Sequence, residues 1–370
     1  MRRVGRVLTG VDRVELAYLR ALQDAPEPVF GLIRSKLGYI LLDPQGVATV
    51  APLLSGGSDS GDTASVWWTV RRAAVARGVP FALPRMLRRR LPVGTVYLNT
   101  GHSNVTDRVL RAMKRADIPI TVFIHDVIPL EFPEYQRDGS VAPFRAMIDR
   151  VSAHADLIIY NSTDTRTRAE VQMVRRVPPS IVAHLGTDIA APRPTELPDG
   201  LPPNAPYFVT PGTIEPRKNH AFLLDLWDEM GTDAPGLVLA GSRGWKNEAV
   251  FARLDALGAD SKVREVSGLS DGALAALING AAGVLLPSHA EGFGLPAVEA
   301  AARGVPVVVN TLDVYAEFLG DIPIYASVSD RYLWIETINT LAKAGHRTQQ
   351  EHQFELPSWD AHFKTVLRLT

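Results

Sequence analysis

The sequence contains no cysteine and no long apolar run. The first absence excludes disulfides, thiolate zinc sites and cysteine nucleophiles, and it suits a reducing compartment. No stretch approaches the roughly 18 to 20 apolar residues that a membrane-spanning helix needs. The basic start of the chain, residues 1–6, is followed by no apolar region of the signal-peptide type. These absences together predict a cytoplasmic protein.

The size and charge of the chain predict two dissimilar halves. At 370 residues the chain exceeds the size at which one hydrophobic core usually stops growing, so we expect two domains of roughly 150 to 200 residues. A hydrophobic content of 46% excludes a mostly disordered chain. The net charge of -1 hides an asymmetry, since residues 1–203 carry 26 Lys and Arg against 20 Asp and Glu, and the remainder carries 13 against 20.

Much of the basic excess lies in one arginine-rich stretch of the first half. Its members are Arg71, Arg72, Arg77, Arg85, Arg88, Arg89 and Arg90. Such a cluster suits peripheral contact with an anionic membrane at its cytoplasmic face, or with an acidic acceptor. A solvated arginine-rich helix face would show the same pattern, so both interpretations stay open.

Short runs rich in Val, Ile and Leu alternate with longer amphipathic stretches, which is typical of βα units around parallel sheets and predicts an α/β fold. The first half has its clearest strands at residues 38–42, 96–99, 118–124 and 157–161. Its predicted helices cover residues 13–23, 144–154 and 162–174.

A proline-rich stretch separates two predicted domains. Residues 191–206 contain six prolines in sixteen residues, which indicates a linker. We therefore expect an N-terminal domain over residues 1–203 and a C-terminal domain over residues 204–356. The second domain has predicted strands at 207–211, 237–240, 263–266, 283–287 and 305–309, and helices that begin at His220, Asn247, Asp271 and Pro296. This is a complete doubly wound domain.

Two adjacent cations follow the first strand of this second series. Ligands of doubly wound domains bind beyond the carboxyl ends of the strands, and there Arg217 and Lys218 stand where a helix begins. An arginine fork, a lysine point charge and helix N-terminal donors together suit a diphosphate. The alternative is a pair of exposed helix-start charges, although cations are unfavourable there without an anion.

Further strand ends carry a glycine-containing loop and two glutamates. The glycines of Gly241-Ser242-Arg243-Gly244 let a backbone approach a ligand. In the segment 291–299, Glu291 lies on a loop that faces the cleft, and Glu299 lies in the first helical turn. The two carboxylates suit an acid and base pair as in glycoside hydrolases, whereas Glu299 is also stabilised there by the helix dipole alone.

A histidine ends one predicted strand of the first half. His125 follows residues 120–124 and is expected to face the interdomain cleft. It is able to donate a hydrogen bond to a sugar hydroxyl, or it is a structural histidine paired with Asp126.

The segments 212–219, 241–244 and 291–299, in this order and with residues 125–130, resemble the family-4 (group 1) retaining glycosyltransferases of the GT-B fold. The likeness is strongest over residues 207–310. It implies two doubly wound, Rossmann-like domains that face a cleft, and a C-terminal helix within residues 357–370 that crosses back to the first domain.

The resemblance also implies roles for single residues. Arg217 and Lys218 would hold the donor diphosphate, Glu299 would accept from the ribose hydroxyls, and Glu291 would contact the transferred sugar. The implied catalytic residues are His125, Glu291, Arg217 and Lys218. The implied donor-binding residues are Gly212, Arg217, Lys218, Ser242, Arg243, Phe293, Gly294, Leu295 and Glu299. The implied acceptor-side residues are Gly10, Asp12 and His102.

The implied reaction moves a hexose from a nucleotide diphosphate sugar to a saccharide or lipid-linked saccharide in surface polysaccharide synthesis. Anomeric configuration is retained, neither a metal nor a cofactor is needed, and the leaving phosphate oxygen deprotonates the acceptor, so neither glutamate is a nucleophile. Mannose from GDP-mannose is a guess based on residues 125–130. Nucleic acid is not an expected partner. The alternatives are a catalytically silent GT-B binding subunit and a nucleotide-sugar epimerase.

One departure from the family pattern lies at the start of the chain. A first domain of this kind opens with an apolar strand, but only Val4–Leu8 precede the glycine-containing loop Thr9–Arg13. Either this short run is the strand, or the start of the gene product is missing.

Overall fold

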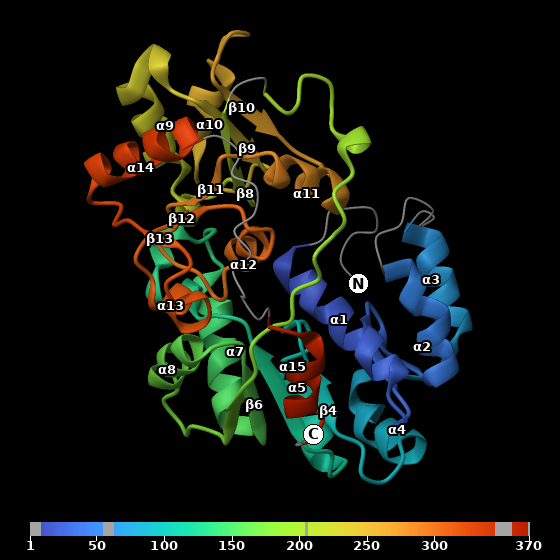
Figure 1. The fold of residues 1–370 in the computed structure, drawn as a ribbon. Coiled ribbons are helices and arrows are strands. Elements are labelled where there is room, and N and C mark those ends of the chain that lie inside the picture. The colour runs from blue at the N-terminus through green and yellow to red at the C-terminus, as the bar shows by residue number, and fades with distance from the viewer. Residues whose placement is uncertain (1–8, 55–62, 204–205, 345–356, 369–370) are drawn as a thin grey trace.

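The computed structural model describes residues 9–54, 63–203, 206–344 and 357–368. The run Val4–Leu8 lies outside these residues. The described strands form three sheets, and Figure 1 shows the largest of them apart from the other two.

A six-stranded sheet contains every described strand after residue 206. Its members are β8 (Tyr207–Pro211), β9 (Gly236–Ala240), β10 (Val263–Val266), β11 (Gly283–Leu286), β12 (Val307–Val309) and β13 (Ile324–Tyr325). All neighbouring pairs are parallel, in the order β10-β9-β8-β11-β12-β13. The order reverses between β8 and β11, and this switch point is where doubly wound sheets bind ligands.

The four helices predicted in this half begin within one residue of their predicted starts, and two further helices, α13 and α14, were not predicted. The helices are α9 (His220–Met230), α10 (Glu248–Asp255), α11 (Asp271–Asn279), α12 (Leu295–Ala301), α13 (Asp313–Leu319) and α14 (Arg331–Ala344). A 3-10 helix, η5 (Pro216–Lys218), precedes α9. The doubly wound pattern predicted for this part of the chain is confirmed.

A second parallel sheet lies in the first half. It consists of β4 (Tyr97–Asn99), β5 (Ile120–Ile124), β6 (Leu157–Tyr160) and β7 (Ser180–Val182), in that order. The helices between and beside these strands are α5 (Asp107–Arg115), α6 (Ile128–Glu131), α7 (Val141–His154) and α8 (Thr163–Val171). The strands predicted at residues 96–99, 118–124 and 157–161 are confirmed within two residues.

The third sheet differs from the prediction, because it is antiparallel. It contains β1 (Gly31–Ser35), β2 (Gly38–Leu42) and β3 (Ala74–Gly78), and it is accompanied by α1 (Gly10–Asp24), α2 (Pro44–Val50), α3 (Thr63–Arg72) and α4 (Leu83–Arg90). The strand at 38–42 has its predicted bounds, but its place in a parallel sheet was wrong. Only Lys36 and Leu37 join it to β1, and so short a connection allows an antiparallel hairpin but no parallel crossover.

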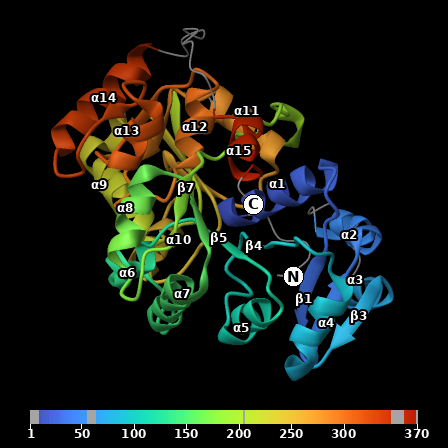
Figure 2. The same ribbon diagram turned by 90° about the horizontal axis from the view of Figure 1, so that it is seen from below.

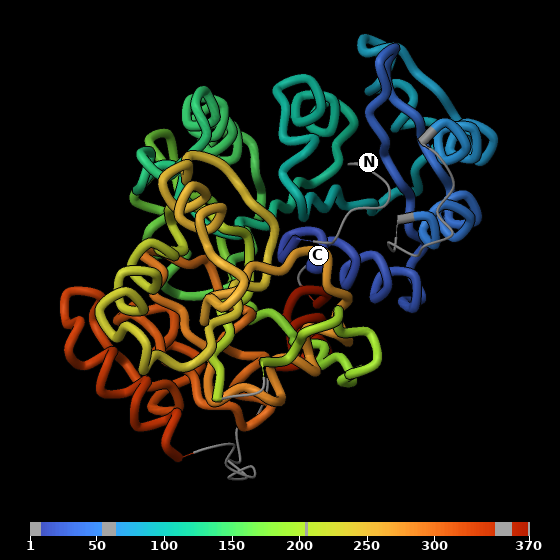
Figure 3. The backbone as a smooth tube through the Cα atoms, turned by 90° about the horizontal axis from the view of Figure 1, so that it is seen from above, coloured from blue at the N-terminus to red at the C-terminus, as the bar shows by residue number. Residues whose placement is uncertain are grey.

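One hydrophobic core joins the two halves of the chain. It includes Val14 and Tyr18 of α1, Phe123 of β5, and many residues around the six-stranded sheet. The last helix, α15 (Trp359–Val366), packs against α1, and His362 Nε2 lies 2.8 Å from the Tyr18 hydroxyl. Figure 3 shows the blue start and the red end of the chain side by side. The predicted return of the C-terminal helix is confirmed.

Candidate functional site

The loops that follow β8 and β9 run side by side at the carboxyl edge of the six-stranded sheet. Ile214 N donates to Ser242 O at 2.9 Å, and Gly212 has a φ of 125°. A Cβ on Gly241 would lie 1.8 Å from Gly212 O, so only glycine fits there. The close approach explains the glycines of the 241–244 loop without a ligand.

A buried ion cluster forms where the loops after β8 and β11 meet. Arg217 Nη1 donates to Glu291 Oε2 at 2.9 Å, and Arg217 Nη2 donates to Glu215 Oε1 at 2.7 Å. Lys218 Nζ donates to Glu291 Oε1 at 2.6 Å, and the same oxygen accepts from the Ser288 hydroxyl at 2.7 Å. Arg217, Lys218 and Glu291, predicted from separate segments, are therefore brought together.

The charges within this cluster compensate one another. Burial alone would raise the pKa of Glu291, but Lys218 and Arg217 outweigh it and lower that pKa to about 2, so the carboxylate is ionised. Burial lowers the pKa of Lys218, and Glu291 opposes that change. The anions that make cations favourable at this helix start are supplied within the protein by Glu215 and Glu291. Contact of the two cations with a diphosphate stays a prediction.

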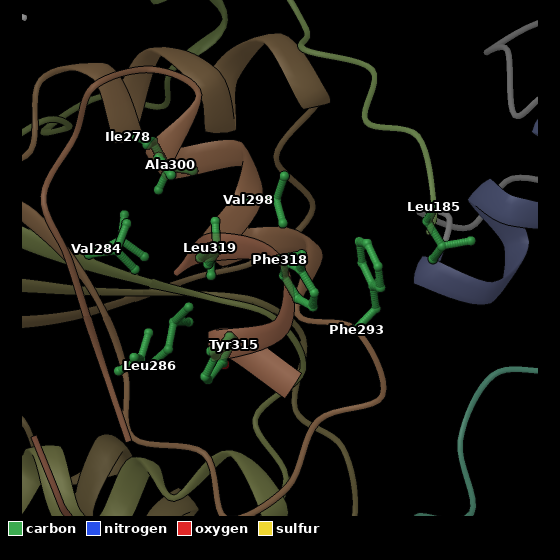
Figure 4. Packing of buried hydrophobic residues seen from close by; sticks show 14 of the residues in the cluster. Leu185, Ile278, Val284, Leu286, Phe293, Val298, Ala300, Tyr315, Phe318 and Leu319 are labelled. Carbon is green, nitrogen blue, oxygen red and sulfur yellow. The ribbon is translucent and has the colours of Figure 1, made fainter. Parts of the chain in front are cut away.

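The backbone of the 291–295 loop is fixed by close packing. Gly294 begins α12 with a φ of 81°, and a Cβ there would lie 2.5 Å from the Tyr315 ring. The Phe293 side chain is 4% exposed and stacks on Phe318 at a centroid distance of 4.3 Å, as Figure 4 shows. The Phe293 ring thus packs in the core. Leu295 lies beside Gly10, whose added Cβ would be 3.9 Å away.

His125 lies at the end of β5, as predicted, and against the glutamate loop. A Cβ on Gly292 would lie 2.7 Å from His125 O, so the two loops touch through backbone. His125 Nε2 lies 2.6 Å from Thr100 O, whereas Asp126 Oδ1 accepts from Ile128 N at 3.1 Å. The suggested pairing of His125 with Asp126 is therefore replaced by a bond to backbone.

The His125 imidazole is neutral. Burial and the nearby His102 ring, whose centroid is 5.4 Å away, lower the pKa of His125 to about 3. A carbonyl oxygen only accepts, so Nε2 carries the proton and Nδ1 is left as an acceptor. In this tautomer Nδ1 has acceptor character only, so a donor role toward a sugar hydroxyl would need Nε2 to leave Thr100 O.

Glu299 is held by a residue that the sequence did not single out. Arg13 Nη1 of α1 donates to Glu299 Oε1 at 2.7 Å, with side-chain exposures of 30% and 13%. Burial raises the pKa of Glu299, and Arg13 opposes that rise. Asp12 instead caps α1, since its carboxylate accepts from Thr9 N at 2.8 Å. The only sequence signal for Arg13 was its place at the end of the glycine-containing loop.

The remaining predicted residues lie apart from the ion cluster. Arg243 turns outward, where Nη2 pairs with Asp255 at 2.6 Å and with Glu265 at 2.7 Å, and Ser242 is exposed. His102 Nε2 bonds to Phe123 O at 2.8 Å. His102 also lines a cavity of about 1160 Å³ between α1, β1 and β4, whose lining does not include Arg217, Lys218 or Glu291. The ion cluster and this cavity are thus two separate features.

Residues 197–323 match the family model "Glycosyl transferases group 1". This part of the chain, about a third of its length, is similar to the group 1 glycosyltransferases. The matched residues contain the ion cluster, Glu299 and all strands of the six-stranded sheet except β13. The resemblance found in the sequence is confirmed.

Relatives of the glycosyltransferase domain include mannosyltransferases. The serotype-specific mannosyltransferase WbdA of Escherichia coli is 28% identical over 257 residues, which cover 63% of this chain and 30% of WbdA. The O-antigen chain mannosyltransferase B of Escherichia coli is 32% identical over 127 residues, which cover 34% of this chain and 33% of that protein. The chain thus spans about a third of the length of these relatives.

The whole chain resembles solved glycosyltransferase structures. Anabaena HepE in complex with UDP-glucose matches with a TM-score of 0.63 and 16% identity, over 92% of this chain and 88% of HepE. TarM matches with a TM-score of 0.55 and 12% identity, over 75% of this chain and 53% of TarM. These likenesses confirm the predicted GT-B fold.

Within the described ranges, no group of three or more His, Asp or Glu side chains is placed to hold a metal ion. Among the same residues, no helix combines the length and the apolar character needed to cross a bilayer.

Proposed function

We propose that this protein is a retaining glycosyltransferase that moves a hexose from a nucleotide diphosphate sugar to a saccharide or lipid-linked saccharide in surface polysaccharide synthesis. The observation that carries the proposal is the buried cluster of Arg217, Lys218 and Glu291 at the switch point of a group 1 glycosyltransferase domain. The mannosyltransferases among the relatives support mannose as the sugar, with GDP-mannose as the first donor to test.

The cluster has the donors that a diphosphate needs. Within the described residues Lys218 Nζ donates one hydrogen bond, to Glu291, although an ammonium group has three N–H donors. The remaining donors are able to bind phosphate oxygens as the leaving group departs. We propose that Arg217 and Lys218 supply the charge stabilisation, so that the reaction needs no divalent metal. Glu291, which is ionised, would then accept hydrogen bonds from hydroxyls of the transferred sugar.

The location that fits this activity is the cytoplasm, with peripheral contact at an anionic membrane. A lipid-linked acceptor would be reached at such a surface, and the exposed arginines of α4 support the contact.

Turnover of a nucleotide sugar tests the proposed activity directly. The purified protein is incubated with a panel of nucleotide sugars, with and without EDTA, and nucleotide diphosphate release and thermal stabilisation are measured. We expect release from one donor that EDTA does not reduce. The proposal would be contradicted if no donor gave nucleotide release and no donor stabilised the protein. Loss of activity in EDTA would contradict metal independence.

The Lys218→Gln variant tests where the diphosphate binds. Glu291 keeps Arg217 as a partner in this variant, so we expect the protein to fold. We expect the donor dissociation constant to rise roughly 10- to 100-fold, because a charge-assisted hydrogen bond contributes about 1.5 to 3 kcal/mol. The exposed Lys262→Gln variant, which makes the same charge change, is the control. Equal donor affinity in both variants would show that the diphosphate binds elsewhere.

A further inference from the structure

Three exposed apolar side chains gather at one end of the antiparallel sheet. Leu37 is 83% exposed in the turn between β1 and β2, Val79 directly follows β3, and Phe81 is 88% exposed in the 3-10 helix η2 (Pro80–Ala82). The turn and the end of β3 are in contact, since a Cβ on Gly38 would lie 3.1 Å from Val79 Cα. Leu37, Val79 and Phe81 are called the apolar tip below.

Helix α4 places a row of cations next to the apolar tip. It begins directly after η2 and buries Leu83, Met86 and Leu87. A Cβ on Gly78 would lie 3.1 Å from Met86 Sδ, so the buried side of α4 rests on the end of β3. The opposite side carries Arg85, Arg88, Arg89 and Arg90, all exposed. Figure 2 shows β1, β3 and α4 together on the side of the molecule away from the six-stranded sheet.

The stretch of sequence that carries α3, β3 and α4 has charges of one sign. Residues 63–106 contain seven arginines and no acidic residue, and Lys36 adds a cation within the β1–β2 turn. In the described ranges, Lys36, Arg85 and Arg89 form no ion pair. Exposed cations of one sign attract an anionic surface, and each contributes favourably near anionic lipid.

We propose that the apolar tip and the outer arginines of α4 form the surface that docks this protein onto an anionic bilayer. Leu37 and Phe81 enter the headgroup region, where their apolar surface leaves water, while the arginines bind lipid phosphates. The seven arginines of residues 63–106, with no carboxylate among them, match an extended anionic surface. They match a protein partner less well, because a protein surface carries charges of both signs. The inference rests on the proposed function in one respect: docking would bring the enzyme to a lipid-linked acceptor in the membrane.

Vesicle flotation tests the apolar part of this surface. The full chain is floated with vesicles of phosphatidylcholine alone and of equal parts phosphatidylcholine and phosphatidylglycerol. We expect binding only to the second kind, and we expect Leu37→Ser with Phe81→Ser to weaken it at least tenfold. The control is Val171→Ser with Val174→Ser, because these side chains are 80% and 83% exposed but lie at the end of α8. The control should bind as the parent does.

Charge removal tests the basic part. Arg85→Gln with Arg89→Gln should lower affinity for the mixed vesicles on the order of thirty-fold, since each surface cation contributes about a fivefold factor. Arg175→Gln with Arg264→Gln removes the same charge elsewhere and should change little. Thermal midpoints equal to that of the parent show that each variant folds.

Several outcomes would overturn the docking proposal. The first is that the parent protein does not bind mixed vesicles. The second is that the tip variant binds them as well as the parent does. The third is that the matched control variants lose as much vesicle binding as the test variants. Binding to an acidic protein but to no vesicle would replace the bilayer with a protein partner. Nucleotide release measured in parallel with a soluble saccharide separates the two proposals, because vesicle binding does not require turnover and turnover on a soluble acceptor does not require vesicles.

Discussion

Arg13 and Glu299 link the first helix of the chain to the first helix after the glutamate loop. Among the described residues, Arg13 donates to Oε1 of Glu299, and Oε2 is the oxygen that would accept a hydroxyl. Burial raises the pKa of Glu299, and Arg13 counteracts this change by stabilising the ionised form. If Glu299 accepts from the donor ribose, Arg13 therefore keeps that acceptor charged.

The Arg13→Gln variant should weaken donor binding several-fold, and more strongly at mildly acidic pH. Without the guanidinium, the pKa of Glu299 rises further, and the protonated carboxyl is a weaker acceptor as the pH falls. Donor dissociation constants at about pH 7.5 and about pH 6 measure the effect. Arg20→Gln, an exposed position on the same helix, is the control. A loss that does not depend on pH would contradict the role in ionisation.

Gly292 sets the distance between the two halves at the site. The Gly292→Ala variant should lose about 1 to 3 kcal/mol of stability, because its Cβ would meet His125 O at 2.7 Å and Asp126 Cβ at 3.0 Å. Chemical denaturation measures the loss. Gly258→Ala is the matched control, since nothing lies within 4 Å of a Cβ there. Equal stability of the two variants would show that the loops that contain Gly292 and His125 move apart without a cost in stability.

At the scale of elements, α13 and α8 are joined by one carboxylate. Glu317 of α13 accepts from Thr163 N at 2.7 Å and from Asp164 N at 3.0 Å, which are the first amides of α8. It also lies 2.9 Å from His184 Nε2, just beyond β7. These bonds lower the pKa of Glu317 in spite of its burial, and the negative charge suits a helix N-terminus.

The Glu317→Ala variant should lower stability by about 1 to 3 kcal/mol, because two amides of α8 lose a charged acceptor. Thermal or urea unfolding measures the change. Glu336→Ala removes an exposed carboxylate from α14 and should change little. We also expect faster hydrogen exchange at Thr163 and Asp164 in Glu317→Ala. Unchanged hydrogen exchange at these two amides would show that water replaces the Glu317 carboxylate as their acceptor without weakening the start of α8.

The elements that the sequence predicted well are those buried on both faces. Strands such as β8 and β9 are buried at every residue, so an apolar run marks them directly. β1 and β3 were missed because their residues are only partly buried and their polar positions interrupt the pattern. Strand pairing depends on the length of the connection, which is why β2 was found but was assigned to the wrong kind of sheet.

For the candidate site, too, the sequence predicted some features correctly and missed others. Glycines and charges at strand ends located Arg217, Lys218 and Glu291, because strand ends of a parallel sheet meet at one edge. The side-chain partners could not be predicted, since Arg13 meets Glu299 across 286 positions of sequence. Arg243 shows the opposite error, because its backbone follows the predicted loop while its side chain turns to Asp255 and Glu265.

At the scale of the whole molecule, three buried histidines should make stability depend on pH. Burial is the largest cause that lowers the pKa of His125 and of His220 to about 3, and that of His362 to about 4. The unfolded chain, with ordinary histidines, binds more protons below about pH 6.5, so stability is full above that pH and is lost as the pH falls. Burial also raises the pKa of Asp126 and Glu299, which opposes this loss at lower pH.

Urea unfolding at several pH values measures this dependence. We expect the free energy of unfolding to fall by about 2 to 4 kcal/mol between pH 7 and pH 5.5. Each of the three histidines contributes up to about 1.4 kcal/mol per pH unit to this fall. The His362→Gln variant should reduce the slope by about a third, since one of three titrating groups is gone. A slope unchanged by this substitution would assign the pH dependence to other groups.

The packing of α15 on α1 has a consequence for synthesis on the ribosome. Tyr18 is translated more than 300 residues before its partners His362 and Phe363. The core that contains Tyr18 and Val366 therefore closes only after residue 366 has left the ribosome. Until then α1 exposes an apolar side that a chaperone would bind, whereas domains usually fold one after another during translation. Nascent chains stopped before Trp359 should accordingly stay protease-sensitive at their N-terminal end.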